Sequence, residues 1–267
     1  MGNADSAASE DRAALLTIEN NGAVLTVGLN RPAKRNALND GIMLAIQDCF
    51  SDIPDGVGAI VVHGIGDHFS SGLDLSELSE RDATEGLQHS QMWHRVFDRI
   101  QYSRVPVIAA LKGAVIGGGL ELACAAHIRV AEPSAYFALP EGQRGIFVGG
   151  GGSVRLPRLI GVPRMIDMML TGRVYSATEG AAYGFAQYLT DAGGALPKAI
   201  ELAERIAGNA PLTNFAVLQA LPMIAEANPQ TGLLMESLMA TVAQSDKEAK
   251  RRIREFLEHK TAKVKPT

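Results

Sequence analysis

Hydrophobic runs separated by polar or glycine-rich segments divide most of the chain into short strands and helices. The β-rich runs LLTIEN and AVLTVGLN flank Asn21 and Gly22, a turn dipeptide, and predict a β-hairpin. Apolar residues at helical spacing predict helices over residues 39–51 and over much of 83–103. Further strands are predicted for GAIVVHG, VPVIAALKG, HIRVAE and AYFALP, and a helix is predicted to begin at GGGLELACAA.

Helix boundary signals are clearest in the second half of the chain. Pro163 and Gly172 bracket a helix, with proline just inside its start and glycine past its end. Ser176 and Glu179 form the pattern of a capping box for the helix that follows. Before these helices, the stretch GQRGIFVGGGGSVRLPRLIG is a long glycine-rich segment.

From about residue 197 the pattern is helical nearly to the end of the chain. We therefore predict an α/β body over residues 13–200 and a helical region over residues 201–267. Residues 1–12 are polar and acidic, lack the features of a secretory signal, and are predicted to be a disordered lead-in. The predicted fold class is α/β with a C-terminal helical region.

Composition and charge narrow the classes of protein that this pattern allows. Hydrophobic residues make up 46% of the chain and charged residues 20%, which allows a sizeable core. The net charge of −4 is unlike that of a general nucleic-acid binder. No apolar run reaches the roughly 18 residues that a membrane span needs. The two cysteines, Cys49 and Cys124, are predicted to be buried thiols. We expect a cytoplasmic protein that binds no nucleic acid and has no membrane span.

Several nucleotide-binding and hydrolytic patterns are absent from the sequence. A G-x-G-x-x-G fingerprint fails because Leu122 and Val154 occupy its last position in the two glycine-rich stretches. There is no P-loop and no G-x-S-x-G elbow. The six histidines form no H-E-x-x-H pattern, and Cys124 has no evident base beside it. We therefore predict no metal site.

Gly117, Gly118 and Gly119 follow the run VPVIAAL and open a predicted helix. Amides at a helix start have no intrahelical partner and lie at the positive end of the helix dipole. Glycine lets a ligand oxygen approach such amides, which makes the turn a site for a developing oxyanion. The Ser- and Gly-rich loop FSSGLDL is a source for a second amide. Alternatively, the glycines only permit tight packing of helix on strand, and the local pattern leaves both interpretations open.

Glu121 and Glu141 are the carboxyl groups that stand out from their surroundings, since the neighbours of Glu121 are apolar on both sides. In one continuous helix, residues this far apart would be separated by about 30 Å, but a helix followed by a returning strand brings them together. In a shared apolar pocket, one carboxyl group would stay ionised while the other stayed protonated. That pair would suit the addition or removal of water. For each residue alone, a solvated or salt-bridged side chain is the alternative.

Five segments in this order resemble the crotonase (enoyl-CoA hydratase/isomerase) family: RPAKRNAL, HFSSGLDLSEL, PVIAALKGAVIGGGLELACAAHIRVA, FALPEGQRGIFVGGGGSVRLPRLIG and LTGRVYSATEGAAYGF. The resemblance covers the chain from about residue 13 to 260. It implies a spiral of ββα units, a C-terminal helical trimerisation region, and a homotrimer or dimer of trimers. It also implies an acyl-CoA thioester as substrate, with no cofactor beyond the coenzyme A of that substrate, and a place in fatty acid metabolism such as β-oxidation.

The resemblance also implies roles for particular residues. Leu73 and Gly118 correspond to the two oxyanion-hole amides, Glu121 and Glu141 to the catalytic glutamates, and Gly149 to the glycine that helps to hold the water. Substrate and CoA binding is carried over to Lys34, Arg35, Ala37, Ser71, Asp74, Leu75, Gly117 and Pro140. Near the C-terminus, Lys260 or Lys263 would either contact a neighbour's nucleotide or lie on a solvated helix face.

The presence of both glutamates favours reversible hydration of a 2-enoyl-CoA to a 3-hydroxyacyl-CoA. The alternatives are an isomerase or lyase of the same superfamily, or a non-catalytic acyl-CoA-binding protein. The sequence departs from the family pattern at Leu139, at the Val148–Val154 stretch and at Arg251 and Arg252. A proline replaced by glycines predicts a looser loop at Val148–Val154. These departures leave the acyl specificity open.

Overall fold

The computed structural model describes residues 14–77 and 80–258. The predicted lead-in, as well as Lys260 and Lys263, therefore lies outside the described residues. The chain divides into two compact units, one ending at Ala207 and the other beginning at Gly208. The boundary predicted at residue 200 falls inside a helix of the first unit. Over the described ranges, none of the helices is long and apolar enough to cross a membrane.

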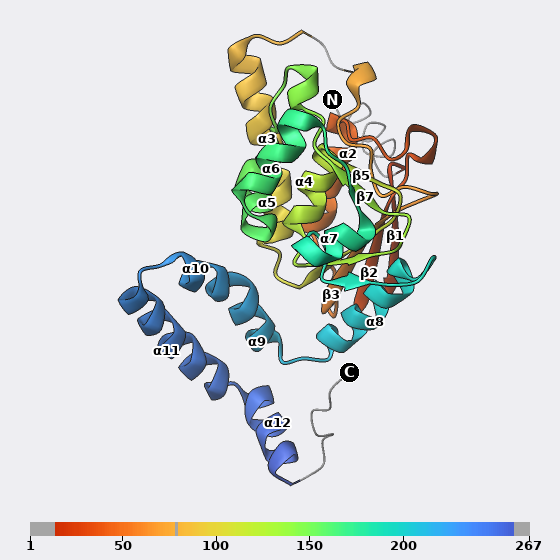
Figure 1. The fold of residues 1–267 in the computed structure, drawn as a ribbon. Helices are drawn as coiled ribbons and strands as arrows, with labels where there is room; N and C mark the ends of the chain where they lie inside the picture. The colour runs from red at the N-terminus through yellow and green to blue at the C-terminus, as the bar shows by residue number, and fades with distance from the viewer. Residues whose placement is uncertain (1–13, 78–79, 259–267) are drawn as a thin grey trace, which may run out of the picture. The chain divides into compact units, whose positions relative to one another are not determined.

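A six-stranded sheet forms the centre of the first unit, in the order β1-β2-β3-β4-β6-β9 (Figure 1). Strands β1 and β2 are the predicted hairpin and pair antiparallel, while the following neighbours pair parallel. The strands are β1 (Leu16–Asn21), β2 (Val24–Leu29), β3 (Ala59–Gly64), β4 (Val107–Leu111), β6 (Ile128–Ala131) and β9 (Tyr188–Leu189).

The inner strands β2, β3, β4 and β6 are buried on both faces of this sheet, and successive residues of each strand point to opposite faces. On β3, Ala59 and Val61 pack with α8 (Ala195–Ala207), whereas Ile60 and Val62 belong to the larger core on the other face. Parallel strands covered on both sides are hydrophobic almost throughout, which explains the continuous apolar runs in the sequence.

Side chains cap the N-terminal ends of two helices that pack on the larger core. Helix α2 (Asp40–Ser51) is capped by the Asn39 side chain, which accepts a hydrogen bond from the Ile42 N–H at 3.0 Å. Helix α3 (Ala83–Gln101) begins with a capping box between Asp82 and Glu85. Both helices agree closely with the predicted 39–51 and 83–103.

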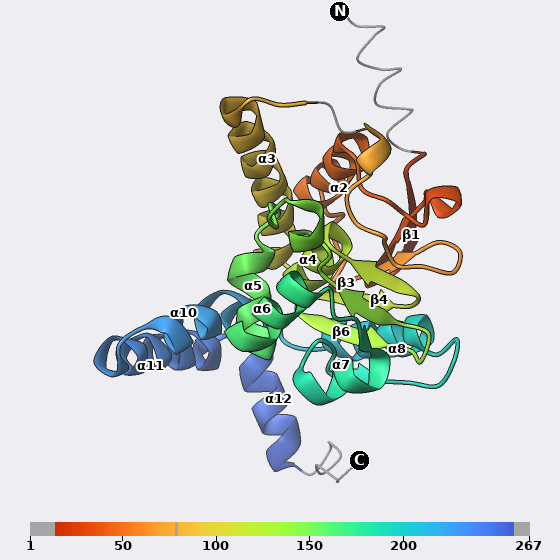
Figure 2. The ribbon, with the colours of Figure 1, turned by 45° about the horizontal axis from the view of Figure 1, so that its top comes forward.

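A smaller sheet, in the order β5-β7-β8, precedes the segments that form the candidate active site. Its strands are β5 (Ala114–Ile116), β7 (Tyr136–Ala138) and β8 (Tyr175–Ser176), and β5 leads directly into α4 (Gly118–Ala125). The segment after β7 carries α5 (Gly152–Ile160), α6 (Val162–Thr171) and α7 (Ala177–Tyr183) (Figure 2). The α6 boundaries and the α7 capping box confirm the predictions. Strands β5, β8 and β9 and helix α5 were not predicted.

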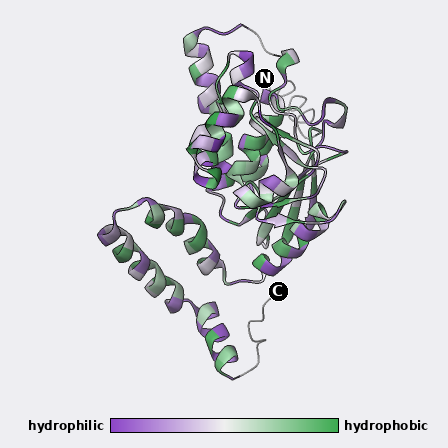
Figure 3. Ribbon diagram, in the orientation of Figure 1, coloured by the Kyte–Doolittle hydropathy of each residue, from purple (hydrophilic) through white to green (hydrophobic). Residues whose placement is uncertain are grey.

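The second unit is helical, as predicted. It contains α9 (Pro211–Phe215), a π-helical turn η4 (Ala216–Ala220), α10 (Leu221–Glu226), α11 (Pro229–Ser245) and α12 (Lys247–Leu257). Many of its large apolar side chains are exposed, and Figure 3 shows hydrophobic residues along α10 and α11. The exposed side chains include Leu221, Met223, Leu233, Leu234, Leu238, Phe256 and Leu257.

Candidate active site

A cavity of about 340 Å³, called the main cavity below, lies in the first unit. Its walls come from residues within the segments 71–75, 86–93, 116–121 and 141–150. Most of the wall is apolar, with Trp93 and Phe147 among its large side chains. An apolar cavity with few polar groups is the usual form of a small-molecule site.

Two backbone segments meet at one wall of the main cavity, around Leu73 and Gly118. A Cβ atom added to Gly118 would lie 3.5 Å from the Leu73 nitrogen, and one added to Gly72 would lie 3.2 Å from the Gly118 nitrogen. Within the described part of the chain, neither the Leu73 N–H nor the Gly118 N–H donates a hydrogen bond. Gly118 is the first residue of α4, so the helix dipole adds positive potential there. The two N–H groups are available to a ligand oxygen.

Glu121 lies one turn into α4 and is 4% exposed. Its Oε1 accepts hydrogen bonds from the Gly150 N–H at 2.9 Å and from the Gly152 N–H at 2.7 Å. Burial raises the pKa of Glu121, while the bonds from Gly152 and Gly150 act in the opposite direction. The result is a buried carboxyl group with an oriented set of backbone donors.

Three glycines of this stretch, Gly150, Gly151 and Gly152, are required by the close packing around Glu121. A Cβ atom at Gly152 would lie 2.7 Å from Glu121 Cγ, and one at Gly150 would lie 2.7 Å from Phe97 Cε2. Gly151 has a φ of +92°, which glycine adopts without strain. The absence of side chains therefore lets the backbone of this stretch surround the Glu121 carboxyl group closely.

Glu141 follows β7 and points its carboxyl group at the start of α4. A Cβ atom at Gly117, where φ is +52°, would lie 2.6 Å from Glu141 Oε1. The other oxygen, Oε2, is buried and has no hydrogen-bond partner among the residues that the structure describes. Burial raises the pKa of Glu141 to about 7, and the nearby Glu121 acts in the same direction.

The structure brings most of the predicted site residues together. Those that line the main cavity are Ser71, Leu73, Leu75, Gly117, Gly118, Glu121, Glu141 and Gly149. A neighbouring groove of about 460 Å³ is lined by Lys34, Arg35, Ala37 and Asp74, and it shares Ser71, Leu73, Leu75 and Arg144 with the main cavity. Pro140 lines neither space.

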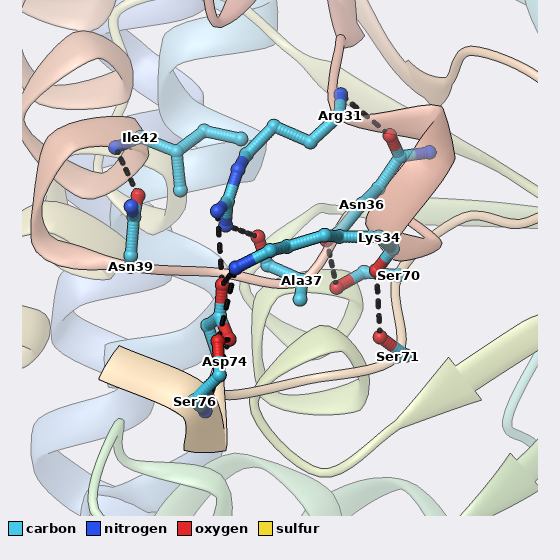
Figure 4. Close-up of polar contacts among 10 residues, drawn as sticks. All are labelled: Arg31, Lys34, Asn36, Ala37, Asn39, Ile42, Ser70, Ser71, Asp74 and Ser76. Carbon is cyan, nitrogen blue, oxygen red and sulfur yellow. Dashed lines mark hydrogen bonds and ion pairs between the residues drawn. The ribbon is translucent and has the colours of Figure 1, made fainter. Parts of the chain in front are cut away.

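Asp74 is the centre of a polar cluster that ties the loop of residues 31–37 to the loop of residues 71–76. Its Oδ2 accepts from Arg31 and from Lys34, each at 2.9 Å, and its Oδ1 accepts from the Ser76 hydroxyl at 2.6 Å (Figure 4). Although burial opposes it, the bonds from Ser76, Lys34 and Arg31 hold the pKa of Asp74 well below its usual range. Asp74 and Lys34, both predicted to contact CoA, thus contact each other.

Sequence reasoning missed several residues of the site. Gly150 and Gly152, which donate to Glu121, were not singled out, although the unusual run of four glycines was a usable signal. His89, Ser90 and Trp93 line the main cavity from α3. Their helical spacing is equally typical of any amphipathic helix, so no sequence signal distinguished them.

Comparison with known proteins identifies the fold as the crotonase fold. A crystal structure of a candidate enoyl-CoA hydratase from Rhodopseudomonas palustris matches with a TM-score of 0.91 at 80% identity and covers 94% of this chain and 97% of that chain. The crystal structure of an enoyl-CoA hydratase from Bacillus anthracis matches with a TM-score of 0.86 at 30% identity, covering 92% and 96% of the two chains.

The family model described as enoyl-CoA hydratase/isomerase matches residues 19–266. The 2,3-dehydroadipyl-CoA hydratase of Escherichia coli is 32% identical over 246 residues, which cover 91% of this chain and 95% of that protein. The short-chain-enoyl-CoA hydratase of Clostridium acetobutylicum is 32% identical over 223 residues, covering 82% and 85%. The chain belongs to the enoyl-CoA hydratase/isomerase family.

Proposed function

We propose that this protein reversibly hydrates a 2-enoyl-CoA to a 3-hydroxyacyl-CoA in the main cavity. The observation that carries the proposal is the meeting of two unlike carboxyl groups, Glu121 and Glu141, with the unpaired amides of Leu73 and Gly118 around one space. Membership of the enoyl-CoA hydratase/isomerase family supports an acyl-CoA substrate.

In the proposed reaction, the thioester carbonyl oxygen accepts hydrogen bonds from the amides of Leu73 and Gly118. These donors stabilise the enolate that develops when water adds to the β-carbon, and losing one such donor typically costs about 10²–10³ in rate. Glu121 takes a proton from the attacking water, which Gly149 helps to hold, and Glu141 delivers a proton to the α-carbon. This mechanism needs Glu121 ionised and Glu141 protonated when the reaction begins, so that the pair holds one proton between them.

The groove beside the main cavity is the proposed path for the CoA part of the substrate. Arg144, which lines both spaces, marks the passage between them. Ser71 and Leu75 also line both spaces, and Lys34 and Arg35 lie along the groove. Pantetheine would follow this groove while the acyl chain enters the main cavity. No metal and no cofactor other than the substrate's own coenzyme A is proposed to take part.

An isomerase of the same family is the second candidate activity, because shifting a double bond needs one carboxyl group to move a proton. The backbone donors to Glu121 favour hydration, since they orient a second carboxyl group beside Glu141. A non-catalytic acyl-CoA-binding protein is the third candidate.

The exposed apolar residues of the helical unit support a further proposal, that the chain assembles as a homotrimer or a dimer of trimers. A contiguous exposed apolar surface usually marks an interaction site. The mass of the protein in solution tests this proposal, and a monomer would contradict it. Cytoplasmic location and a role in fatty acid β-oxidation stay predictions.

The experiment for the main proposal is an acyl-CoA panel with product identification. Crotonyl-CoA and longer, branched and aromatic 2-enoyl-CoAs are mixed with the protein, and the enoyl-thioester absorbance is followed. Hydration predicts decay of the absorbance and a 3-hydroxyacyl-CoA product. A separate set of reactions uses 3-enoyl-CoAs, and products with a shifted double bond but no net water addition would favour the isomerase. No turnover across the panel would favour the binding protein.

A further inference from the structure

The loop of residues 149–152 consists of four glycines, and glycine has the least intrinsic preference for any one backbone conformation. Yet two of its N–H groups meet one oxygen of Glu121 at 2.9 and 2.7 Å. Partners outside the loop must therefore fix the orientation of its peptide groups.

Ser90 of α3 supplies the first of these partners. Its hydroxyl donates to the Gly149 carbonyl oxygen at 2.7 Å, while the His94 ring nitrogen lies further away at 3.4 Å. The Gly149 carbonyl and the Gly150 N–H belong to one planar peptide group and point in opposite directions. Ser90 thus holds one end of the peptide whose other end donates to Glu121. Hydrogen bonds in such a chain also polarise one another.

Arg155 of α5 supplies the second partner, from outside the main cavity. Its Nη1 donates to the Gly150 carbonyl oxygen at 2.9 Å. Its other nitrogens donate to Gln101 at 2.5 Å and to Asp98 at 2.6 Å, so α3 holds the guanidinium in place. Arg155 is 9% exposed, and its planar group fixes the direction of each bond.

These contacts come from one face of α3. Ser90, His94 and Asp98 are each four residues apart, and such residues lie above one another on a helix. The apolar residues Trp93 and Phe97 belong to the neighbouring, buried face. The polar face of α3, which sequence reasoning would assign to solvent, therefore contacts the glycine loop.

We propose that Ser90 and Arg155 are positioning residues that orient the glycine loop and, through it, the carboxyl group of Glu121. This inference rests on the proposed function for its effect on catalysis, but the orientation of Glu121 is a property of the free protein. Neither residue transfers a proton. Ser90 keeps the Gly150 N–H aimed at Glu121 Oε1, and Arg155 fixes the next peptide group, between Gly150 and Gly151.

Interpreting a titration of Glu121 requires knowing which charged and titratable groups surround it. Glu141 faces it from the turn after β7, Arg155 from α5, and Cys124 lies on α4 itself. His94 and Asp98 of α3 contact the partners of the loop. Ser90 carries no charge, so a titration shift in Ser90→Ala reports hydrogen bonding to Glu121 and not a lost charge.

The test compares Ser90→Ala, Ser90→Thr and Arg155→Lys with the wild-type protein. Gln91→Ala is the control, because Gln91 is an exposed neighbour on the same helix. One readout is the pH dependence of kcat and KM for hydration. The other is the infrared carboxyl band of Glu121 in the free protein, isolated as the difference between each variant and the same variant carrying Glu121→Gln.

We expect Ser90→Ala to lower kcat roughly 5- to 10-fold, the effect of one neutral hydrogen bond, with little change in KM. Its infrared titration and the acidic limb of its kcat profile move to higher pH, because the ionised carboxylate loses an oriented donor. Arg155→Lys gives the same direction of shift, Ser90→Thr restores wild-type values, and Gln91→Ala leaves them unchanged.

An infrared titration of Glu121 that is the same in wild type, Ser90→Ala and Arg155→Lys would overturn the inference. A raised KM with unchanged kcat in Ser90→Ala would also overturn it, because Ser90 would then be a substrate contact. If the wild-type protein hydrates no enoyl-CoA, the proposed function fails, and the infrared readout alone decides the positioning role.

Discussion

Glu121, on α4, and Glu141, in the turn after β7, face the same cavity but differ in their hydrogen bonding. Glu121 accepts two backbone N–H groups through Oε1, whereas Oε2 of Glu141 has no partner within the described residues. Burial raises the pKa of both groups; the N–H groups of Gly150 and Gly152 oppose this rise at Glu121, whereas at Glu141 it is opposed by that residue's own backbone N–H. Two identical functional groups are thereby held in different hydrogen-bonding surroundings, which is how a protein assigns different roles to two carboxyl groups.

The largest expected effect comes from removing either carboxyl group. Glu121→Gln and Glu141→Gln preserve shape but abolish proton transfer, so we expect each to slow hydration by about 10²–10⁴-fold. Initial rates with crotonyl-CoA measure the loss, and the Kd for a 3-hydroxyacyl-CoA serves as the control for intact binding. Full activity in either variant would contradict the division of roles between the two glutamates.

The next effect comes from filling the space that the glycine loop leaves for Glu121. In Gly152→Ala the new methyl group would lie 2.7 Å from Glu121 Cγ, so the loop or the carboxyl group must shift. We expect a destabilisation of about 1–3 kcal/mol and a loss of activity. Thermal unfolding and hydration rates measure both.

Gly41→Ala is the matched control for Gly152→Ala. There the added methyl group meets the flexible end of the Leu15 side chain at 3.2 Å and Asn39 Oδ1 at 3.5 Å, and it has no atom of Glu121 or Glu141 within 4 Å. If Gly152→Ala behaves like Gly41→Ala, close wrapping of Glu121 by the loop is not needed.

The raised pKa of Glu141 predicts a pH-dependent stability. Its pKa rises from an ordinary value of 4.5 to about 7 in the fold, so the folded protein binds this proton more tightly. The stabilisation is complete below 4.5 and is lost as pH rises toward 7. It amounts to at most about 3 kcal/mol, at about 1.4 kcal/mol per pH unit.

Denaturant unfolding across this range measures the effect as the difference between wild type and Glu141→Gln. The free energy of unfolding of wild type should fall with pH relative to the variant. If the free energies of unfolding of wild type and Glu141→Gln change with pH in parallel, Glu141 titrates normally in the fold.

Asp74 is expected to have the smallest effect on stability. Its pH dependence has the opposite sign to that of Glu141. Its pKa is lowered in the fold, so its contribution is present above its ordinary pKa of 3.8 and is lost as pH falls below that value. Lys34, one of its partners, is half exposed, so Asp74→Asn should cost only about 1 kcal/mol at neutral pH. Urea unfolding of wild type and Asp74→Asn at neutral pH and near pH 3 measures this, with the difference shrinking in acid. A difference that grows in acid would be evidence against the ion pairs.

Much of the fold was predictable because its signals are local. The hairpin around Asn21 and Gly22, the α3 start and the capping box of Ser176 all depend on residues close in sequence. Strands β5, β8 and β9 are two or three residues long, which is too short to show a period of two. Helix α5 begins in glycines, which have low helix propensity.

The site was predictable in part for the same reason. Gly118 and Glu121 lie on one helix start, and Glu141 stands out in its motif, but the wrapping of Glu121 by the glycine loop depends on residues far along the chain. The predicted loosening of that loop considered only glycine's freedom. In the structure, Ser90, Arg155 and Glu121 bind its peptide groups, and no local pattern reports such tertiary contacts.

The central claim, hydration in the main cavity, is tested most directly by mass spectrometry of the product formed from crotonyl-CoA in water enriched in heavy oxygen. The account predicts a 3-hydroxyacyl-CoA that has gained one labelled water, formed by wild type and not by Glu121→Gln within the same time. Recovery of unlabelled crotonyl-CoA, or equal labelling by wild type and Glu121→Gln, would contradict it.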